Sequence, residues 1–176
     1  QVKSCILLAG LNAGGKTTVV EPLETRDHTE RMLRWFGVEV HEEIAADGKR
    51  NSVEGHSRLK AKDLSIPADI SSAAFFLIAA ACLCRSELRI SNVGLNPTRK
   101  AVLDVLLQFG AEINVENERT VCNEPVGDMI VRSGERIRLG GSRNELHGDV
   151  IANLIDELPI LAVLGTQLEG GLEIRD

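Results

Sequence analysis

The sequence lacks the run of ~18–20 apolar residues that a membrane-spanning helix needs. Its longest apolar stretch, residues 73–84, is too short and predicts a buried helix instead. An excess of basic residues is also missing, because 20 Lys and Arg stand against 26 Asp and Glu, a formal net charge of −6. Such a chain does not attract a phosphate backbone, which argues against a general nucleic-acid binder. A starting methionine and a signal-peptide cleavage pattern are lacking as well.

Cysteine is scarce and poorly placed for metal binding. There are four cysteines, and two of them, Cys82 and Cys84, are spaced C-x-C within an apolar stretch that has no histidine nearby. A structural zinc site needs four convergent ligands, so we expect no metal site here. The cysteines are interpreted as small apolar core residues of a cytoplasmic protein, where thiols stay reduced.

Residues 10–17 match the pattern G-x-x-x-x-G-K-T of phosphate-binding loops. A working loop follows a strand and opens a helix, whose N–H groups face the phosphates. Here the preceding residues 2–11 favour a helix. Residues 17–20 are all β-branched and favour a strand, and Pro22 would break a helix soon after its start. The order is reversed, so we predict a plain glycine turn with a solvated Lys16.

A helix–strand–helix–strand order occurs twice along the chain. Two glycines at the ends of the second helices, Gly37 and Gly110, are 110 − 37 = 73 residues apart, and each suits a left-handed helix cap. A third copy begins at residues 158–171 and stops after the strand at 172–176. With strand meanders expected at 50–72 and 119–149, the fold class is α/β (α+β) with repeated helix–strand units. The unfinished third copy predicts a segment of a longer protein.

Several polar residues at helix starts are candidates for chemistry. Thr25 or Asp27 is expected to cap the helix that follows, with Glu30 completing a capping box. Arg26 lacks such an explanation, because the helix dipole disfavours a cation there, and it predicts an anion site. His28 is interpreted as a surface or capping residue. Arg99 also begins a helix, and we expect it to be solvated.

Carboxylates also stand at helix starts. Asp69, with Ser71 and Ser72, is expected to cap the apolar helix that follows Pro67. Asp156 and Glu157 lie between apolar residues, where a carboxylate needs a partner or a function. Asp156 either caps the helix that contains Pro159 or accepts a proton from a substrate hydroxyl, and position alone leaves both open.

Six stretches together resemble the middle of the 5-enolpyruvylshikimate-3-phosphate synthase family, and the similarity covers essentially the whole chain. They are residues 1–11, 25–33, 69–81, 94–106, 124–131 and 154–163. The resemblance implies an enolpyruvyl transferase fold with inner helices and outer sheets, incomplete in this chain. Residues 1–67 would be the C-terminal part of the first lobe, and 68–176 the N-terminal part of the second. The sequence "RDHTE" at 26–30 resembles the glyphosate-insensitive bacterial type.

The activity that the resemblance implies is transfer of the enolpyruvyl group of phosphoenolpyruvate to the 5-hydroxyl of shikimate 3-phosphate, with release of phosphate. This reaction belongs to aromatic amino acid biosynthesis and needs no cofactor. By matching position, Gln1 and Arg26 would bind shikimate 3-phosphate, and Asp156 would hold the 5-hydroxyl and transfer its proton. Glu157 is interpreted as structural.

The chain departs from the family pattern in several places. The family's cation-rich motifs for phosphoenolpyruvate match no position in this sequence, so the segment alone is expected to be inactive. Ala68 stands in place of a usual glycine, and Ala152 in place of a usual proline, and each change is expected to loosen its turn.

Other functions and partners stay open at the level of sequence. The alternatives are a UDP-N-acetylglucosamine enolpyruvyl transferase and a non-catalytic anion-binding module. Incomplete repeats expose apolar faces, so a homo-oligomer or pairing with a complementary fragment is a further hypothesis. Neither nucleic acid nor a membrane is expected as a partner.

Overall fold

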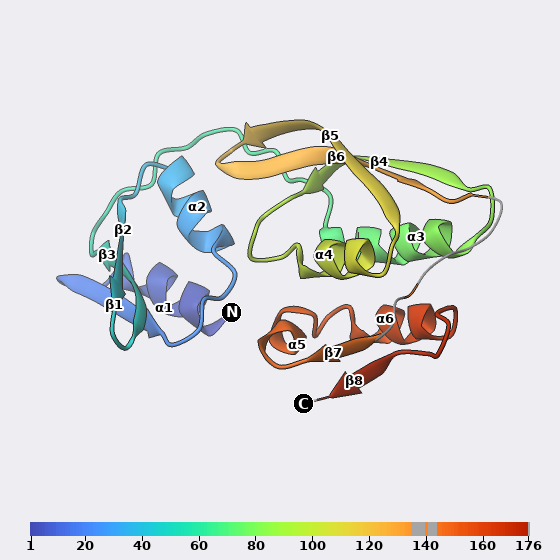
Figure 1. Ribbon diagram of the computed structural model, residues 1–176. Coiled ribbons are helices and arrows are strands. Elements are labelled where there is room, and N and C mark those ends of the chain that lie inside the picture. Colours follow the sequence, from blue (N-terminus) through green and yellow to red (C-terminus); the bar gives the residue numbers. More distant parts are fainter. Residues whose placement is uncertain (135–139, 141–143, 176) are drawn as a thin grey trace. The chain divides into compact units, whose positions relative to one another are not determined.

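The computed structural model describes residues 1–134, 140 and 144–175, which form two compact units (Figure 1). The first unit comprises residues 1–65 with 121–124, and the second comprises 66–120 with the chain from 125 onward. Each unit has its own buried apolar cluster. Among the described helices, none combines the length and the apolar character that a membrane span requires. The division into parts of two lobes at residue 67 stays a prediction.

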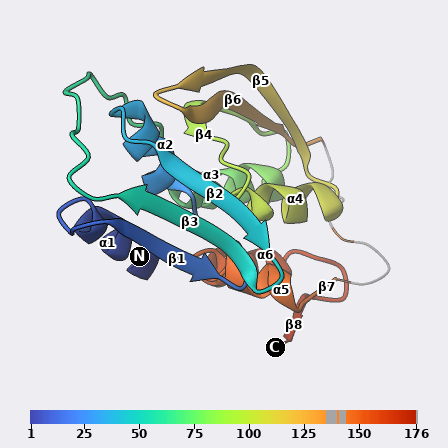
Figure 2. The same cartoon turned by 90° about the vertical axis from the view of Figure 1, so that its left-hand side faces the viewer.

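The first unit packs two helices with a three-stranded sheet. Strand β3 is central and pairs antiparallel with both β1 and β2, so that Val53 lies opposite Thr17 on one side and Val40 on the other. Figure 2 shows the three strands side by side. Val53 is fully buried in a small core with leucines of both helices. In chain order the elements are α1 (Val2–Gly10), β1 (Lys16–Glu21), α2 (His28–Trp35), β2 (Val40–Ala45) and β3 (Gly48–Glu54).

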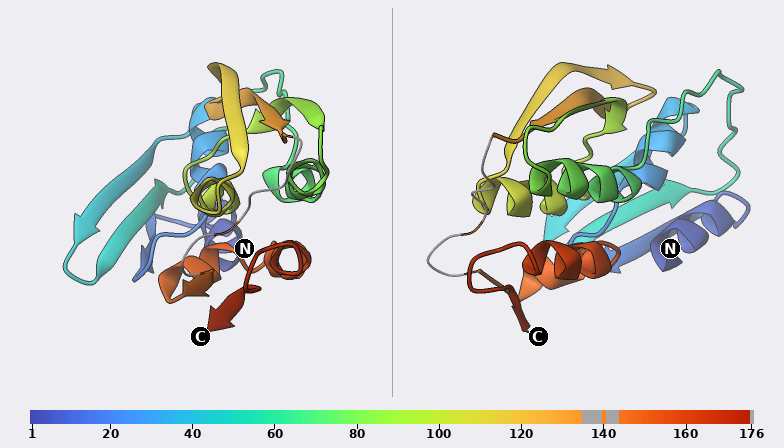
Figure 3. Two further views of the ribbon diagram at one scale, coloured as in Figure 1. Left: turned by 45° about the vertical axis from the view of Figure 1, so that its right-hand side comes forward. Right: turned by 90° about the vertical axis from the view of Figure 1, so that its right-hand side faces the viewer.

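The second unit repeats this order of elements. Its sheet is arranged β4-β6-β5, which matches the β1-β3-β2 order of the first, and α3 and α4 lie against one face of it (Figure 3). The repeat expected from the sequence is therefore confirmed. The elements are α3 (Ile70–Cys82), β4 (Glu87–Gly94), α4 (Ala101–Gln108), β5 (Glu112–Val121) and β6 (Glu124–Arg132).

The end of the chain adds the start of a third copy. Helix α6 (Leu158–Gly165) and strand β8 (Glu173–Arg175) correspond to the predicted helix and strand, and β8 pairs in parallel with β7 (Glu145–His147). Helix α5 (Asp149–Asn153) was not expected, because five residues are too few to show a helical period. Parts of the predicted meander at 135–139 and 141–143, and Asp176 of the predicted strand, lie outside the described residues.

Both predicted glycine caps form, and they have the same geometry. Gly37 and Gly110 have φ of 84° and 85°. After α2, the amide of Gly37 donates to the Arg34 carbonyl at 3.1 Å and that of Val38 to the Leu33 carbonyl at 2.9 Å. The bonds after α4 are equivalent, at 3.0 and 2.9 Å. This pair of bonds requires a left-handed backbone conformation at the residue that ends the helix, and glycine adopts that conformation without steric penalty.

The glycine turn at residues 11–15 joins the end of α1 to the start of β1. Gly15 has φ of 77°, and Lys16 begins β1 with an exposed side chain. The turn therefore follows a helix and precedes a strand, as predicted. The next element of the chain is a strand, so no helix N-terminus follows the turn. This described segment therefore lacks the geometry of a phosphate-binding loop.

The cysteines differ from the prediction. Cys5 and Cys84 are exposed, so their interpretation as core residues is wrong, whereas Cys82 is partly buried and packs against the apolar core of the second unit. The buried residues of α1 are Lys3, Leu7 and Gly10, and Cys5 lies on another face of that helix. The apolar stretch of α3 is likewise buried on one face only, because Phe75 and Phe76 are 50% and 62% exposed. Within the described ranges no group of His, Cys, Asp and Glu is arranged to hold a metal ion.

Candidate active site

The first unit contains a buried ionic cluster between α1, β1 and α2. The Lys3 ammonium lies 2.9 Å from a Glu21 oxygen and 2.6 Å from a Glu30 oxygen, and all three side chains are less than a tenth exposed. Asn51 donates to the same Glu21 oxygen at 2.7 Å. Lys3 thus links the helix that begins after Gln1 to the helix that follows Arg26. Two carboxylates and one ammonium leave a formal charge of −1 in this cluster.

The start of α2 differs from the expected capping box. Asp27 is the N-cap residue, but its side chain makes no capping hydrogen bond in the described structure and instead accepts from Arg31 Nε at 2.8 Å. Glu30 is fully buried against Lys3 and does not turn back to the helix start. The capping-box prediction is wrong because a buried lysine competes for Glu30, and a buried charge needs its counter-ion.

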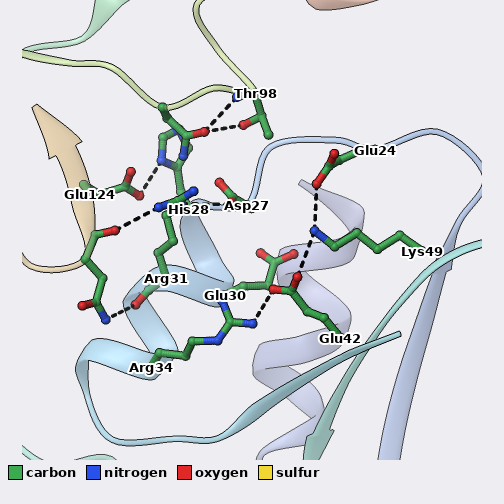
Figure 4. A network of polar contacts seen from close by, with 12 residues as sticks. Glu24, Asp27, His28, Glu30, Arg31, Arg34, Glu42, Lys49, Thr98 and Glu124 are labelled. Carbon is green, nitrogen blue, oxygen red and sulfur yellow. Dashed lines mark hydrogen bonds and ion pairs between the residues drawn. The ribbon is translucent and has the colours of Figure 1, made fainter. Parts of the chain in front are cut away.

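Gln1 and Arg26 are both exposed in the first unit. Gln1 is the N-cap of α1, and Arg26 lies in the connection between β1 and α2. Close to Arg26, His28 Nδ1 lies 2.7 Å from Glu124, and Arg31 donates to the Asn123 carbonyl at 3.1 Å (Figure 4). Both contacts hold the start of α2 against residues 121–124, which belong to the same unit. The connection that carries Arg26 is therefore fixed at the helix side.

Asp156 lies in the second unit, in the turn between α5 and α6, with its side chain 48% exposed. Pro159 occupies the first turn of α6 as expected. The N-cap of α6 is Glu157, however, so the hypothesis that Asp156 caps this helix is wrong. The Asp156 carboxylate instead pairs with Arg99 Nη1 at 3.3 Å.

Arg99 is not solvated, contrary to expectation, because its side chain is only 12% exposed. Besides Asp156, its guanidinium donates through Nη2 to Asp69 Oδ1 at 3.2 Å and to the Ser71 hydroxyl. Ser71 in turn donates to Glu157, which is buried. The chain of contacts joins the start of α3, the turn before α4 and the residues that precede α6.

The turn that carries Arg99 is built around Asn96. The Asn96 side-chain oxygen accepts from the backbone N–H and the hydroxyl of Thr98, at 2.9 and 2.8 Å, and Asn96 is 1% exposed. The Arg99 amide then donates to the Asn96 carbonyl at 2.9 Å. Asparagine favours such turns because its side chain can imitate the backbone. The local sequence therefore fixes the backbone from which the Arg99 side chain extends.

Asp69 caps α3 as predicted, since one of its oxygens accepts from the backbone N–H and the hydroxyl of Ser72, both at 3.0 Å. Burial opposes the ionisation of Asp69, but the Ser72 hydrogen bonds and the Arg99 guanidinium outweigh it and keep the pKa of Asp69 below its ordinary value. Just before Asp69, Ala68 exchanges backbone hydrogen bonds with Asn92 and Gly94 at 2.8 and 2.9 Å. Ala152, the other departure, lies within α5.

The predicted site residues divide between the units. Gln1 and Arg26 belong to the first and Asp156 to the second, so their joint action on one substrate stays a prediction. Sequence reasoning missed Lys3 and the partners of Arg99. Lys3 was detectable in principle, because it lies on the helical face of Leu7 and Gly10, where a charged residue implies a buried partner.

Comparison with known proteins finds matches over the whole length of this chain. Residues 1–176 match the sequence model of the family EPSP synthase (3-phosphoshikimate 1-carboxyvinyltransferase). The 3-phosphoshikimate 1-carboxyvinyltransferase of Geobacillus kaustophilus is 52% identical over all of this chain, and that of Synechococcus sp. is 53% identical. The chain spans 39% and 38% of the length of these two relatives.

Solved structures agree with the sequence match. EPSP synthase from Acinetobacter baumannii superposes with a TM-score of 0.85 at 42% identity, over 98% of this chain and 37% of that chain. The enolpyruvyl transferase NikO from Streptomyces tendae gives a TM-score of 0.66 at 21% identity, which shows a shared fold alone. The predicted enolpyruvyl transferase fold, as a partial domain, is therefore confirmed. The match over the whole length, at about half of all positions, places this chain in the EPSP synthase family.

Proposed function

We propose that this chain forms part of the active site of a transferase that moves the enolpyruvyl group of phosphoenolpyruvate to the 5-hydroxyl of shikimate 3-phosphate. The observation that carries the proposal is the Asp156 carboxylate. It is half-exposed just before α6, it pairs with an arginine whose side chain is only 12% exposed, and it stands in a chain that matches the EPSP synthase family throughout. A cytoplasmic location is part of the same proposal.

The chemistry requires a base at the acceptor hydroxyl. In the addition step the 5-hydroxyl oxygen bonds to C2 of phosphoenolpyruvate, its proton passes to the base, and C3 gains a proton. In the elimination step C3 loses a proton, the C2=C3 double bond re-forms, and phosphate leaves C2. Asp156 is the proposed base, because a carboxylate beside an arginine and open to solvent is able to accept the hydroxyl proton.

Binding of the acceptor is assigned to the first unit. Arg26 is an exposed cation in the connection that leads into α2, where the N–H groups of the helix start also favour an anion. Gln1, at the start of α1, is the proposed polar contact to the same substrate. The parts of the two lobes, 1–67 and 68–176, would supply acceptor binding and proton transfer respectively.

A phosphate-release assay tests this proposal. In the full-length protein that contains this chain, Asp156→Ala should lower kcat about 100-fold or more, the effect of losing a general base. Arg26→Ala should raise the KM for shikimate 3-phosphate. Lys16→Ala, at the exposed start of β1, is the matched control and should leave both constants unchanged. Residues 1–176 alone should release no phosphate.

Three outcomes would overturn the proposal. Turnover with UDP-N-acetylglucosamine in place of shikimate 3-phosphate would show that the acceptor is the nucleotide sugar. Binding of shikimate 3-phosphate without any turnover in the full-length protein would make this an anion-binding module. Wild-type kcat in the Asp156→Ala variant would remove the assigned base.

A further inference from the structure

We infer that Arg99 is a positioning residue for Asp156: it holds the proposed catalytic carboxylate in a fixed place relative to the start of α3. The inference rests on the proposed function, because Arg99 would act on the reaction only through Asp156. It goes beyond that function by giving a role to a residue that the sequence predicted to be solvated.

Arg99 is largely shielded from solvent. Its side chain is 12% exposed, whereas its two carboxylate partners, Asp69 and Asp156, are 53% and 48% exposed. A guanidinium removed from water needs compensation, and here two carboxylates provide it. They contact different terminal nitrogens, Nη2 for Asp69 and Nη1 for Asp156. The planar fork of arginine allows this division, and the single ammonium of a lysine does not.

Arg99 is itself anchored at both ends. Its backbone is fixed by the turn around Asn96. Its guanidinium is fixed by Asp69, which is held in turn by capping α3 through Ser72. The position of Nη1, and with it that of the Asp156 carboxylate, therefore follows from well-defined local structure.

A parallel contact holds the neighbouring residue. The Ser71 hydroxyl accepts from Arg99 Nη2 and donates to Glu157, the buried N-cap of α6. Asp156 is thus connected to the start of α3 through Arg99, and Glu157 is connected to it through Ser71. Loss of Arg99 would remove this contact from the Asp156 carboxylate, while the apolar packing of α6 remains.

A displaced base lowers the rate of the chemical step more than it weakens substrate binding. Misplacing a catalytic group by about 1 Å is able to lower the rate about 100-fold. In the full-length protein we therefore expect Arg99→Ala to lower kcat by about 10- to 100-fold, with the KM for shikimate 3-phosphate changed less than about threefold. Added guanidinium chloride at millimolar concentration should restore part of the lost kcat by occupying the vacated position.

Two further variants are needed, the conservative Arg99→Lys and the control Arg132→Ala. Arg99→Lys keeps a cation and preserves folding, but kcat should still fall, because lysine cannot contact both carboxylates at once. Arg132→Ala removes a more exposed arginine that pairs with Glu87 at 3.0 Å on the sheet of the same unit, and it should leave kcat unchanged. Circular dichroism of every variant checks that the fold is retained.

The double variant Arg99→Ala/Asp156→Ala separates the two levels of the argument. If Arg99 acts through Asp156, the double variant should be no slower than Asp156→Ala alone. Wild-type kcat in both Arg99 variants, beside an impaired Asp156→Ala, would overturn the inference and leave the proposed function standing. An additional loss in the double variant would also overturn it. Wild-type kcat in Asp156→Ala would instead overturn the proposed function.

Discussion

Removal of the Lys3 ammonium is expected to destabilise the first unit strongly. Lys3→Met keeps most of the apolar stem and deletes the charge. It leaves Glu21 and Glu30, 6% and 0% exposed, without their shared cation. Glu21 keeps hydrogen bonds from Thr25 and Asn51, but Glu30 has no hydrogen-bond partner among the described residues. The penalty therefore falls mainly on Glu30.

The contact distances give the scale of the effect. At an effective dielectric constant of about 20, unit charges 2.6 and 2.9 Å apart attract each other by about 6 kcal/mol per pair. The desolvation of three buried charges and the repulsion between the carboxylates offset much of this attraction. Measured losses of one partner from a buried ion pair are about 3–5 kcal/mol. We expect Lys3→Met to lower the free energy of opening of the first unit by that amount.

Hydrogen exchange of the full-length protein, read on the amides of α1 and α2, measures this local opening. Lys49→Met is the matched control, because Lys49 also contacts two carboxylates, Glu24 at 2.7 Å and Glu42 at 3.0 Å (Figure 4). Those partners are 57% and 33% exposed, so the loss should be below about 1 kcal/mol. The double variant Lys3→Met/Glu30→Gln should regain part of the stability, because one buried anion is removed.

Equal effects of Lys3→Met and Lys49→Met, both below about 1 kcal/mol, would refute the reasoning. Such a result would mean that water reaches the buried carboxylates, or that the helices move apart to admit it. A double variant less stable than Lys3→Met would also contradict the argument, since Glu30 would then stabilise the unit without its cation.

Two further predictions concern the sheet of the second unit and the glycine caps. Hydrogen bonds from Asn117 and from the Asn92 backbone, together with Arg89, lower the pKa of Asp128 to about 2. Because the folded pKa is depressed, this stabilisation is present above the ordinary value of 3.8 and is lost as pH falls through about 2. Asp128→Asn should therefore flatten the dependence of the urea midpoint on pH in this window, and an unchanged slope would count against the assignment. Gly37→Ala should destabilise the first unit by about 1–2 kcal/mol in the same hydrogen-exchange experiment, because alanine is strained at φ of 84°, and a neutral effect would show that the cap relaxes.

Local chemistry made much of the fold predictable from the sequence. The glycine caps, the Asp69 cap of α3 and the helix–turn–strand order around Gly15 depend on residues within one or two turns of each other. The repeat followed from the same local patterns occurring twice. The short helix α5 was not predicted, because it has too few residues to show a helical period.

The roles of the charged residues were decided by tertiary structure. Arg99 was predicted to be solvated because its partners, Asp69 and Asp156, are 30 and 57 residues away in the sequence. The partner Glu21 of Lys3 could not be predicted either, because it is 18 residues away. Sequence determined which side chains stand at helix starts and on helix faces, since neighbouring residues fix backbone geometry. Folding determined which opposite charges meet and lose their water, because that depends on how distant elements pack.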